Sequence, residues 1–335
     1  MLVVGLNWLG DAIMSLSAMA VLRARQPGAF ITILVRPALA ELWALCPYVD
    51  EVAVQDMGFF GTFRTAAAVR RGGYATAWVM PKSFRSALLA RWGGAPERVG
   101  LPGHGRDWLL TRVVALSEGG SRHQVFEYLD LVGAQPAEAV QPPYLRPPAE
   151  AVVVVRQRLA KWGAPEAPLV GMFPGAARGP SKRWPAERFA AVARRLVIED
   201  GCRVAVFGSE ADREDCEAVT VAAGVGVMNL AGTTRLDALA AWLSLCRVAI
   251  ANDSGGMHLA AGLGVPTVGI FGITDPTRTG PVGQGHRLVT ADGVNRSRAV
   301  PRDSAVARTA MLSIEPSRVY SAAQELLAKA AGGST

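Results

Sequence analysis

Short apolar segments alternate with helical segments along both halves of the chain, and this alternation restricts the fold more than any other feature. In the first half, the sequence predicts a helix from Ala12 to Arg25. The apolar segments of this half predict strands at Leu2–Leu6, Phe30–Val35, Glu51–Val54 and Ala75–Met80. Because parallel strands must be joined by a crossover, usually a helix, the pattern predicts βαβ units in a parallel sheet.

A cluster of prolines separates the two halves. Four prolines lie within residues 142–148, and such clusters are typical of linkers. The alternation restarts beyond them and predicts strands at Leu169–Phe173, Arg203–Phe207 and Arg247–Ala251, with helices at Ala186–Glu199 and from Pro316 to Ala330. With 335 residues, the chain is long enough for two α/β domains. We expect one domain at residues 1–148, a second at 149–312, and a C-terminal helix at 313–335.

The composition indicates a cytoplasmic protein without a membrane span. The longest uncharged stretch, Ser254 to Thr274, contains six glycines and Pro266, which argues against a helix in a bilayer. The N-terminus has no basic segment, and Asp11 interrupts its apolar run, unlike a signal peptide. The four cysteines are scattered without a CxxC pair, so we expect reduced thiols and neither metal ligands nor disulfides.

The charge balance of the chain is basic. The net charge is +7, and arginine supplies most of the excess. This balance favours anionic partners such as phosphates, sugar acids or an acidic membrane face, with a solvated basic surface as the alternative. Nucleic acid is not an expected partner, because the sequence has no nucleic-acid-binding motif and no regular interleaving of basic and aromatic residues.

The segment Asn252–His258, with the sequence NDSGGMH, lies between a predicted strand and a short predicted helix. Asp253 or Ser254 is a suitable cap for this helix, and the amides of the next three residues then lack intrahelical acceptors. A helix start carries about half a positive charge and free N–H donors. The segment therefore predicts a phosphate or diphosphate site, with an ordinary strand-to-helix turn as the alternative.

The N-terminal segment Gly5–Asp11, GLNWLGD, places an acid at the start of a helix after a strand. Because ligands bind at the carboxyl ends of parallel strands, Asp11 is a candidate general base. A helix cap without a catalytic role is the alternative. The glycine spacing does not match the dinucleotide fingerprint GxGxxG.

A basic loop at residues 173–185, FPGAARGPSKRWP, follows another predicted strand. Glycines and prolines restrict this loop, which carries Arg178, Lys182 and Arg183. These cations are suited to neutralising a diphosphate, with a solvated basic loop as the alternative. We expect Trp184 to pack in the core.

An acidic segment, Gly208–Asp212, lies beyond the next predicted strand. Asp212, with Glu210 as its rival, is a candidate acceptor of hydrogen bonds from ribose hydroxyls. An ordinary surface acid is the alternative for either residue.

A second basic block begins at Met80 and follows a predicted strand of the first half. Its basic and hydroxyl side chains predict a surface for an anionic acceptor, with a solvated face as the alternative for each. The candidate acceptor-binding residues are Lys82, Ser83 and Arg85, together with Arg64 from the preceding segment.

Four segments, in order, resemble glycosyltransferase family 9, the ADP-heptose:lipopolysaccharide heptosyltransferases, and within it the heptosyltransferase II type. These segments are NWLGDAIMSLSAM, MPKSFRSALLARWGGAPERVG, PGAARGPSKRWP and NDSGGMHLAAGLGVPTVGIFG, within residues 1–280. The resemblance implies a GT-B fold of the α/β class, with two Rossmann-like parallel-sheet domains facing a central cleft. It also implies that the C-terminal helix packs back on the first domain.

The resemblance further implies an inverting, metal-independent transfer of heptose. The donor is ADP-L-glycero-D-manno-heptose, a co-substrate, and the acceptor is an anionic lipopolysaccharide inner-core glycolipid, with no cofactor. By motif position, Asp11 corresponds to the family's proposed catalytic base. The residues implied in donor binding are Lys182, Asp253, Ser254, Gly255, Gly256 and His258, with Arg178 and Asp212 as neighbours. Such an enzyme is cytoplasmic, with peripheral electrostatic contact to the inner membrane.

One departure from the family leaves alternatives open. Residues 283–312 contain no cysteine, whereas heptosyltransferase II sequences commonly carry a cysteine-rich stretch there. Another nucleotide sugar or acceptor is therefore an alternative within the GT-B glycosyltransferases. A GT-B-like nucleotide-sugar epimerase would share the donor site without needing an acceptor, and a non-catalytic nucleotide-sugar-binding protein is the third alternative.

Overall fold

The chain divides into two compact units. The computed structural model describes the chain except for residues 118–121, 140, 164–165, 177–178, 295–303 and 333–335. The first unit is Met1–Leu145 and the second is Arg146–Thr335. The boundary falls inside the proline cluster at residues 142–148.

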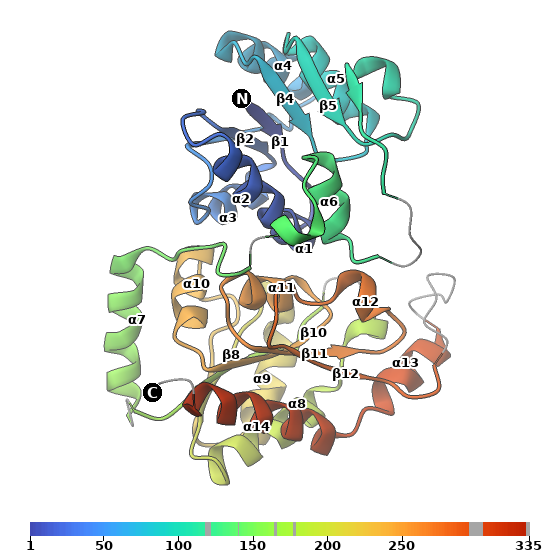
Figure 1. Cartoon of the computed structure of the whole chain (residues 1–335). Helices are drawn as coiled ribbons and strands as arrows, with labels where there is room; N and C mark the ends of the chain where they lie inside the picture. Colours follow the sequence, from blue (N-terminus) through green and yellow to red (C-terminus); the bar gives the residue numbers. More distant parts are fainter. Residues whose placement is uncertain (118–121, 140, 164–165, 177–178, 295–303, 333–335) are drawn as a thin grey trace. The chain divides into compact units, whose positions relative to one another are not determined.

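The first unit is a six-stranded parallel sheet with helices on both faces. Its strands are β1 (Leu2–Val4), β2 (Thr32–Val35), β3 (Glu51–Val54), β4 (Thr76–Val79), β5 (Glu97–Gly100) and β6 (Arg112–Val113), in the order β3-β2-β1-β4-β5-β6. Its α-helices are α1 (Leu9–Met14), α2 (Leu16–Arg25), α3 (Ala40–Ala44), α4 (Gly61–Gly72), α5 (Phe84–Trp92) and α6 (Val125–Leu131). Short 3₁₀ turns are η1 (Pro37–Leu39), η2 (Asp107–Leu109) and η3 (Pro136–Glu138). Figure 1 shows α4 and α5 on one face of this sheet and α2, α3 and α6 on the other.

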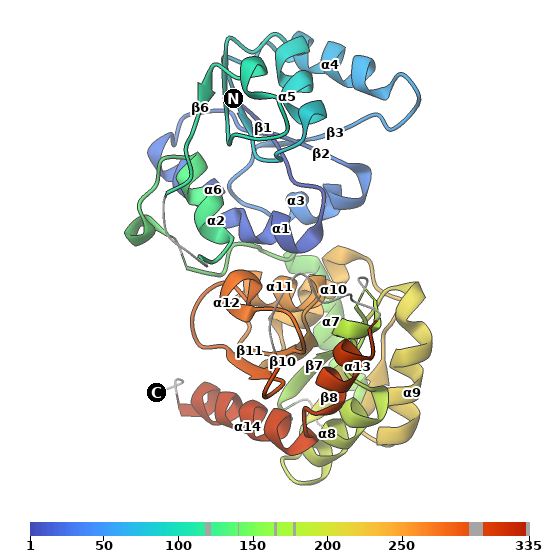
Figure 2. The same cartoon turned by 90° about the vertical axis from the view of Figure 1, so that its right-hand side faces the viewer.

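The second unit repeats this architecture. Its strands are β7 (Leu169–Phe173), β8 (Arg203–Val206), β9 (Val227–Asn229), β10 (Val248–Asn252), β11 (Thr267–Phe271) and β12 (Arg287–Thr290), in the order β12-β11-β10-β7-β8-β9. Its helices are α7 (Ala149–Trp162), η4 (Pro180–Lys182), α8 (Ala186–Ile198), η5 (Glu210–Asp212), α9 (Arg213–Ala223), α10 (Leu236–Ser244), α11 (Gly255–Gly262), α12 (Pro276–Thr279), α13 (Ala305–Leu312) and α14 (Pro316–Gly332). Figures 1 and 2 show α8 and α14 on one face of the sheet and α10 and α11 on the other. The predicted α/β class, with two Rossmann-like parallel sheets, is confirmed.

Both sheets place the first strand of the unit beside the fourth. β1 pairs in parallel with β4, and β7 pairs in parallel with β10. The strand order changes direction between these two strands in each sheet. Open α/β sheets bind ligands in the crevice at the carboxyl ends of such a pair of strands. The loops after these four strands contain most of the predicted site residues. The order of the strands, which the sequence pattern alone did not predict, therefore brings the motifs of each unit together.

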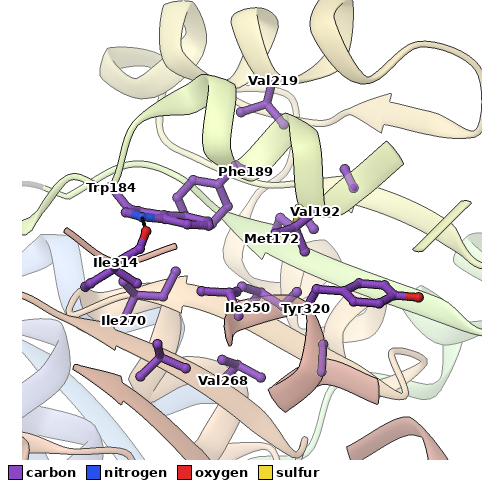
Figure 3. Close-up of a cluster of buried hydrophobic side chains, with 14 of the residues drawn as sticks. Met172, Trp184, Phe189, Val192, Val219, Ile250, Val268, Ile270, Ile314 and Tyr320 are labelled. Atoms are coloured by element: carbon purple, nitrogen blue, oxygen red, sulfur yellow. Dashed lines mark hydrogen bonds between the residues drawn. The ribbon is translucent and has the colours of Figure 1, made fainter. Parts of the chain in front are cut away.

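The core of the second unit lies between its sheet and the helices α8 and α14. Figure 3 shows Ile250 and Ile270 of the sheet facing Phe189 of α8 and Tyr320 of α14. The strands β7, β10 and β11 are buried along their whole length, because helices cover both faces of the sheet. Trp184 is 1% exposed in this core, and its indole N–H donates to the Ile314 carbonyl at 3.0 Å. The prediction for Trp184 is confirmed.

The predicted helix from Ala12 to Arg25 is interrupted. It begins earlier, at Leu9, and divides into α1 and α2 at Ser15. The hydroxyl of Ser15 donates to the Ala12 carbonyl at 2.7 Å. Such a bond competes with the regular helical hydrogen bonds, and serine side chains make it often.

The C-terminal part of the chain forms β12, α13 and α14. The predicted last helix is confirmed as α14, which packs on α8, β10, β11 and β12 of its own unit. Its expected packing on the first domain stays a prediction, and residues 333–335 lie outside the described residues. The segment 283–312, for which the sequence predicted no element, contains β12 and α13, while residues 295–303 lie outside the described residues.

Candidate functional site

One buried side chain fixes the end of β10 to the loop that follows β7. Asn252 is 0% exposed, and its side-chain oxygen accepts a hydrogen bond from the Trp184 backbone N–H at 3.1 Å. Its side-chain nitrogen donates to the Pro174 carbonyl at 2.6 Å. Because both ends of the basic loop are tied to the same residue, the loop must lie at the carboxyl ends of β7 and β10. The sequence placed Asn252 in a motif but gave it no separate role.

Two of the predicted donor-binding residues form an ion pair beside α11. Lys182, at the end of η4, donates a hydrogen bond to the carboxylate of Asp253, which directly follows β10. The two side chains are only 11% and 5% exposed. Solvent and salt therefore screen this pair much less than a surface pair. The ammonium group also compensates a carboxylate that would otherwise oppose an anion at the start of α11.

The start of α11 has the geometry of an anion site. Ser254 is the N-cap in extended conformation, with φ −145° and ψ 174°, and its hydroxyl makes no capping hydrogen bond. The first amides of a helix, here including those of Gly255 and Gly256, have no intrahelical acceptor and carry the positive end of the helix dipole. His258 is 5% exposed, on the second turn of the helix. The predicted N-cap is confirmed as Ser254 and not Asp253.

Packing gives the reason for glycine at position 256. A Cβ atom there would lie 2.4 Å from Cδ1 of Phe173 on β7. Glycine therefore allows the helix to pack closely on the strand.

The other basic residues of the loop differ in position. Arg178 lies outside the described residues, so its donor contact stays a prediction. Arg183 donates from Nε to the Ala176 carbonyl at 3.1 Å and pairs with Asp215 at 3.3 Å. Arg183 therefore fastens the loop to α9, and Lys182 is the basic residue that lies at the start of α11.

The two acidic candidates after β8 have separate environments. Asp212 accepts hydrogen bonds from the Ser209 amide at 3.0 Å and from the Ser209 hydroxyl at 2.6 Å. A Cβ atom at Gly175 would lie 2.2 Å from the Asp212 carboxylate, so Asp212 borders the loop after β7. Glu210 instead pairs with Arg213 at 2.6 Å, with both side chains more than half exposed. Asp212 is thus the better placed of the two, and its contact with a ribose stays a prediction.

In the first unit, Asp11 lies on the first turn of α1 after β1. The N-cap of this helix is Trp8, so Asp11 does not occupy the capping position that the alternative interpretation required. Its carboxylate is half-buried and accepts a hydrogen bond from Nε2 of Gln124 at 3.2 Å. The same Nε2 donates to the Tyr128 hydroxyl at 2.7 Å. Burial, aided by the negative charge of Asp11, raises the pKa of Tyr128, so the phenol stays protonated.

Helix α6 also contacts the basic loop after β4. Lys82 pairs with Glu127 of α6 at 2.7 Å, one helical turn from Gln124. The start of α1, which carries Asp11, and the loop that carries Lys82 are therefore joined through the N-terminal end of α6. The sequence did not predict the roles of Gln124 and Glu127, because they lie 113 and 45 residues from their partners.

The two other candidates in this loop lie at the start of α5. Ser83 caps the helix by accepting a hydrogen bond from the Ser86 amide at 3.3 Å. Nε of Arg85 is buried and has no hydrogen-bond partner in the part of the chain that the structure describes. Its contact with the acceptor stays a prediction.

A buried arginine, Arg106, donates hydrogen bonds to the backbone of the loop that follows β4. Arg106 is 0% exposed and donates to the carbonyls of Pro81, Ser83 (3.2 Å) and Leu101 (2.8 Å). Burial lowers the pKa of its guanidinium, yet these carbonyls stabilise the charged form. This role was not predicted from the sequence, because an arginine is ordinarily exposed.

Arg64 is separate from the other acceptor candidates. It lies on α4 and pairs with Asp56 at 3.1 Å. Within the described residues, no hydrogen bond or ion pair joins it to Lys82, Ser83 or Arg85. Its acceptor role stays a prediction.

Comparison with known proteins gives the class. The family model for glycosyltransferase family 9 (heptosyltransferase) matches residues 62–305. The chain is 32% identical over 303 residues to lipopolysaccharide heptosyltransferase 2 of Escherichia coli K12, covering 86% of this chain and 87% of that protein. The solved structure of ADP-heptose lps heptosyltransferase II from E. coli has a TM-score of 0.82 and 29% identity, with 98% of each chain covered. A family 9 structure from Veillonella parvula, 24% identical, has the same fold, with a TM-score of 0.83 over 98% of this chain and 97% of that one.

The E. coli relative covers 86% of the chain and the solved structures 98%, and their fold agrees with the two Rossmann-like units described above. The chain belongs to glycosyltransferase family 9, the heptosyltransferases. It is accordingly a glycosyltransferase with the GT-B type of fold.

Proposed function

We propose that this family 9 enzyme transfers heptose from ADP-L-glycero-D-manno-heptose to a lipopolysaccharide inner-core acceptor, with inversion at the anomeric carbon. Family membership supports the sugar, and the names of the E. coli relatives support both ADP-heptose and lipopolysaccharide. The observation that carries the donor assignment is the Lys182–Asp253 pair at the start of α11. A cation and free amides lie together there, as a nucleoside diphosphate requires.

The second unit binds the donor in this proposal. The amides of Gly255 and Gly256 and the ammonium of Lys182 hold the diphosphate, while Asp253 orients the lysine. Asp212 accepts hydrogen bonds from the ribose. Hydrogen-bond donors that are already oriented in the free enzyme stabilise the charge that develops in the transition state. In this reaction that charge develops on the departing diphosphate. The proposal includes no metal ion and assigns the stabilisation of this charge to the helix amides and to Lys182.

The first unit binds the acceptor and supplies the base. The acceptor hydroxyl oxygen forms a bond to the anomeric carbon while the bond from that carbon to the diphosphate oxygen breaks. ADP leaves with the bonding electrons, and the hydroxyl proton passes to the carboxylate of Asp11. The hydrogen bond from Gln124 positions this carboxylate. Lys82, Ser83 and Arg85, with Arg64, bind the anionic groups of the acceptor. One displacement inverts the configuration.

The site of action in this proposal is the cytoplasmic face of the inner membrane, with peripheral contact. The net charge of +7 supports attraction to an anionic glycolipid surface. Each cation near such a surface gains about 1 kcal/mol, which salt screens. Vesicle binding should therefore weaken in high salt. Among the described residues, no helix has the length and apolar character needed to span a bilayer.

The test is mass-spectrometric detection of transfer from ADP-heptose to a panel of truncated lipopolysaccharide cores, with and without a chelator. We expect a product one heptose heavier with at least one core, unaffected by the chelator. UDP- and GDP-sugars serve as controls. The proposal fails if no core is extended, or if another nucleotide sugar is the better donor. Epimerisation of the donor without any acceptor would instead establish the epimerase alternative.

A further inference from the structure

Large apolar side chains gather on the surface beside the start of α4. Phe59 is 96% exposed, Phe60 55%, Phe63 58% and Met57 49%. Phe63 stacks on Trp92 of α5 with ring centroids 4.8 Å apart, and Phe59 meets Phe60 edge-on at 4.9 Å. We call Met57, Phe59, Phe60, Phe63 and Trp92 the aromatic patch. Four of these residues lie within seven positions of the sequence, and Trp92 stacks on one of them; a gathering of exposed apolar side chains of this kind marks an interaction site.

The helices that carry and border the aromatic patch have charge of one sign. α4 and α5 contain no Asp or Glu, and their charged residues are Arg64, Arg70, Arg71, Arg85 and Arg91. Arg91 precedes Trp92 in the sequence, and the side chain of Arg70 reaches Gly94 at the end of α5. The nearby acid Asp56 is paired with Arg64. The surface around the patch is therefore basic.

We propose that the aromatic patch docks on a bilayer of anionic phospholipid. Phe59 and Phe60 insert between the headgroups, and Arg70, Arg71 and Arg91 bind lipid phosphates. Aromatic side chains with a basic surround are the composition of interfacial membrane contacts. The charge complements an anionic surface, whereas a second copy of this chain would bring like charges together. An almost fully exposed phenylalanine such as Phe59 also suits a deformable lipid interface better than a rigid protein surface.

The purpose of this contact rests on the proposed function, because a lipopolysaccharide core acceptor is anchored in a membrane. The lipid contact itself is tested without donor or acceptor. A failure of heptose transfer and a failure of membrane docking are therefore separate results.

The first experiment is flotation of the full chain with vesicles of phosphatidylcholine alone or mixed with phosphatidylglycerol. The variant is Phe59→Ser combined with Phe60→Ser, and the matched control is Val225→Ser, at a residue 94% exposed in the second unit. We expect the double variant to lose affinity for the anionic vesicles by roughly tenfold or more, while Val225→Ser binds like the wild type. Equal binding by the double variant and the wild type would overturn the proposal.

The second experiment places a probe at the loop tip. The four natural cysteines are buried, and burial raises the pKa of the Cys46 thiol to about 12, so a new cysteine is the reactive one. An environment-sensitive dye on Phe59→Cys should shift its emission to the blue with anionic vesicles, and a dye on Val225→Cys should not. No shift at position 59 would contradict insertion. A shift that follows protein concentration without vesicles would assign the patch to self-association and overturn the proposal.

An activity assay separates docking from catalysis. The Phe59→Ser, Phe60→Ser variant should transfer heptose to a soluble, deacylated core at the wild-type rate. Its transfer to a core embedded in anionic vesicles should fall. Equal rates of the variant and the wild type on both acceptors would contradict the proposed role of the patch.

Discussion

Lys182 and Asp253 lie 71 residues apart in the sequence, and their side chains form an almost fully buried ion pair at the start of α11. The pair joins the basic loop after β7 to the end of β10. Both residues matched the family's donor motifs. Their direct contact places an ammonium group and a carboxylate side by side at the start of α11. A buried pair loses more when one member is removed than when both are replaced, because an unpaired buried charge is costly.

Lys182→Ala should weaken donor use by roughly tenfold to a hundredfold, since a charge-assisted contact contributes about 1.5–3 kcal/mol. The variant should also melt at a lower temperature, because Asp253 is left without its cation. ADP affinity by calorimetry and turnover with ADP-heptose measure the first effect. Arg183→Ala, one residue away and directed to Asp215, is the matched control and should affect the donor less.

Replacing both members separates binding from stability. Lys182→Met with Asp253→Leu should recover much of the melting temperature lost in Lys182→Ala, while donor use stays low. Recovery of both the melting temperature and the donor use would show that the ion pair has a structural role alone. Wild-type donor affinity and turnover in Lys182→Ala would contradict the assigned position of the loop.

Asn252→Ala should destabilise the second unit. It leaves the Trp184 amide and the Pro174 carbonyl without their side-chain partner, at about 1–3 kcal/mol for each group. Urea denaturation measures the change in the free energy of unfolding, with the unfolding transition of the second unit as the signal. Asn229→Ala is the control, since Asn229 is partly exposed and bonds to the Glu217 carboxylate and the Ala231 amide. If the two variants lose equal stability, the bridge by Asn252 does not hold the loop.

The stability of the second unit should decrease as the pH falls below about 6.5, because of His286. Burial lowers the pKa of this histidine from its ordinary value of 6.5. Its Nδ1 accepts from the Thr267 amide at 3.2 Å and its Nε2 contacts the Val282 carbonyl at 2.8 Å, which suits a neutral ring with the proton on Nε2. Because the folded-state pKa is the lower one, the unfolded chain takes up the proton first on acidification. This group thus favours unfolding progressively as the pH falls.

His286→Gln should flatten this dependence, since a neutral amide keeps one donor and one acceptor. Melting temperatures measured from about pH 7.5 to about pH 5 provide the test. The control is His104→Asn, at an exposed position with φ of 53°, a conformation that Asn tolerates. An unchanged pH dependence in His286→Gln would contradict the assignment.

Local pattern predicted several strands, including the edge strand β3, but it missed the buried strand β11 (Thr267–Phe271). Leu169–Phe173 and Glu51–Val54 were predicted with the bounds observed. A buried parallel strand is a continuous apolar run, as in β7, which makes it visible in the sequence. By contrast, β5 and β6 contain Glu97, Arg98 and Arg112, and their polar character concealed them. Strand order and register depend on tertiary packing, which local periodicity does not contain.

The site shows the same division between local and long-range information. Asp11, Lys182 and Asp253 belong to contiguous motifs, so the sequence was sufficient to select them. Gln124 and Arg106 were missed, because their roles consist of contacts with distant segments. A motif identifies a candidate group, and the fold determines what positions it.

The assignment of Asp11 as the catalytic base is the central claim of the mechanism. Asp11→Asn keeps the shape of the side chain and an oxygen that can accept from Gln124, but it removes the proton acceptor. Gln124→Ala is a useful companion, because it should disturb the position of the carboxylate and reduce turnover less than Asp11→Asn does.

The most direct measurement is the turnover of Asp11→Asn with ADP-heptose and a lipopolysaccharide core, taken together with its ADP affinity and melting temperature. We predict that ADP affinity and melting temperature stay near the wild-type values while turnover falls by roughly 10²–10⁴. Wild-type turnover in this variant would contradict the assignment of Asp11 as the base.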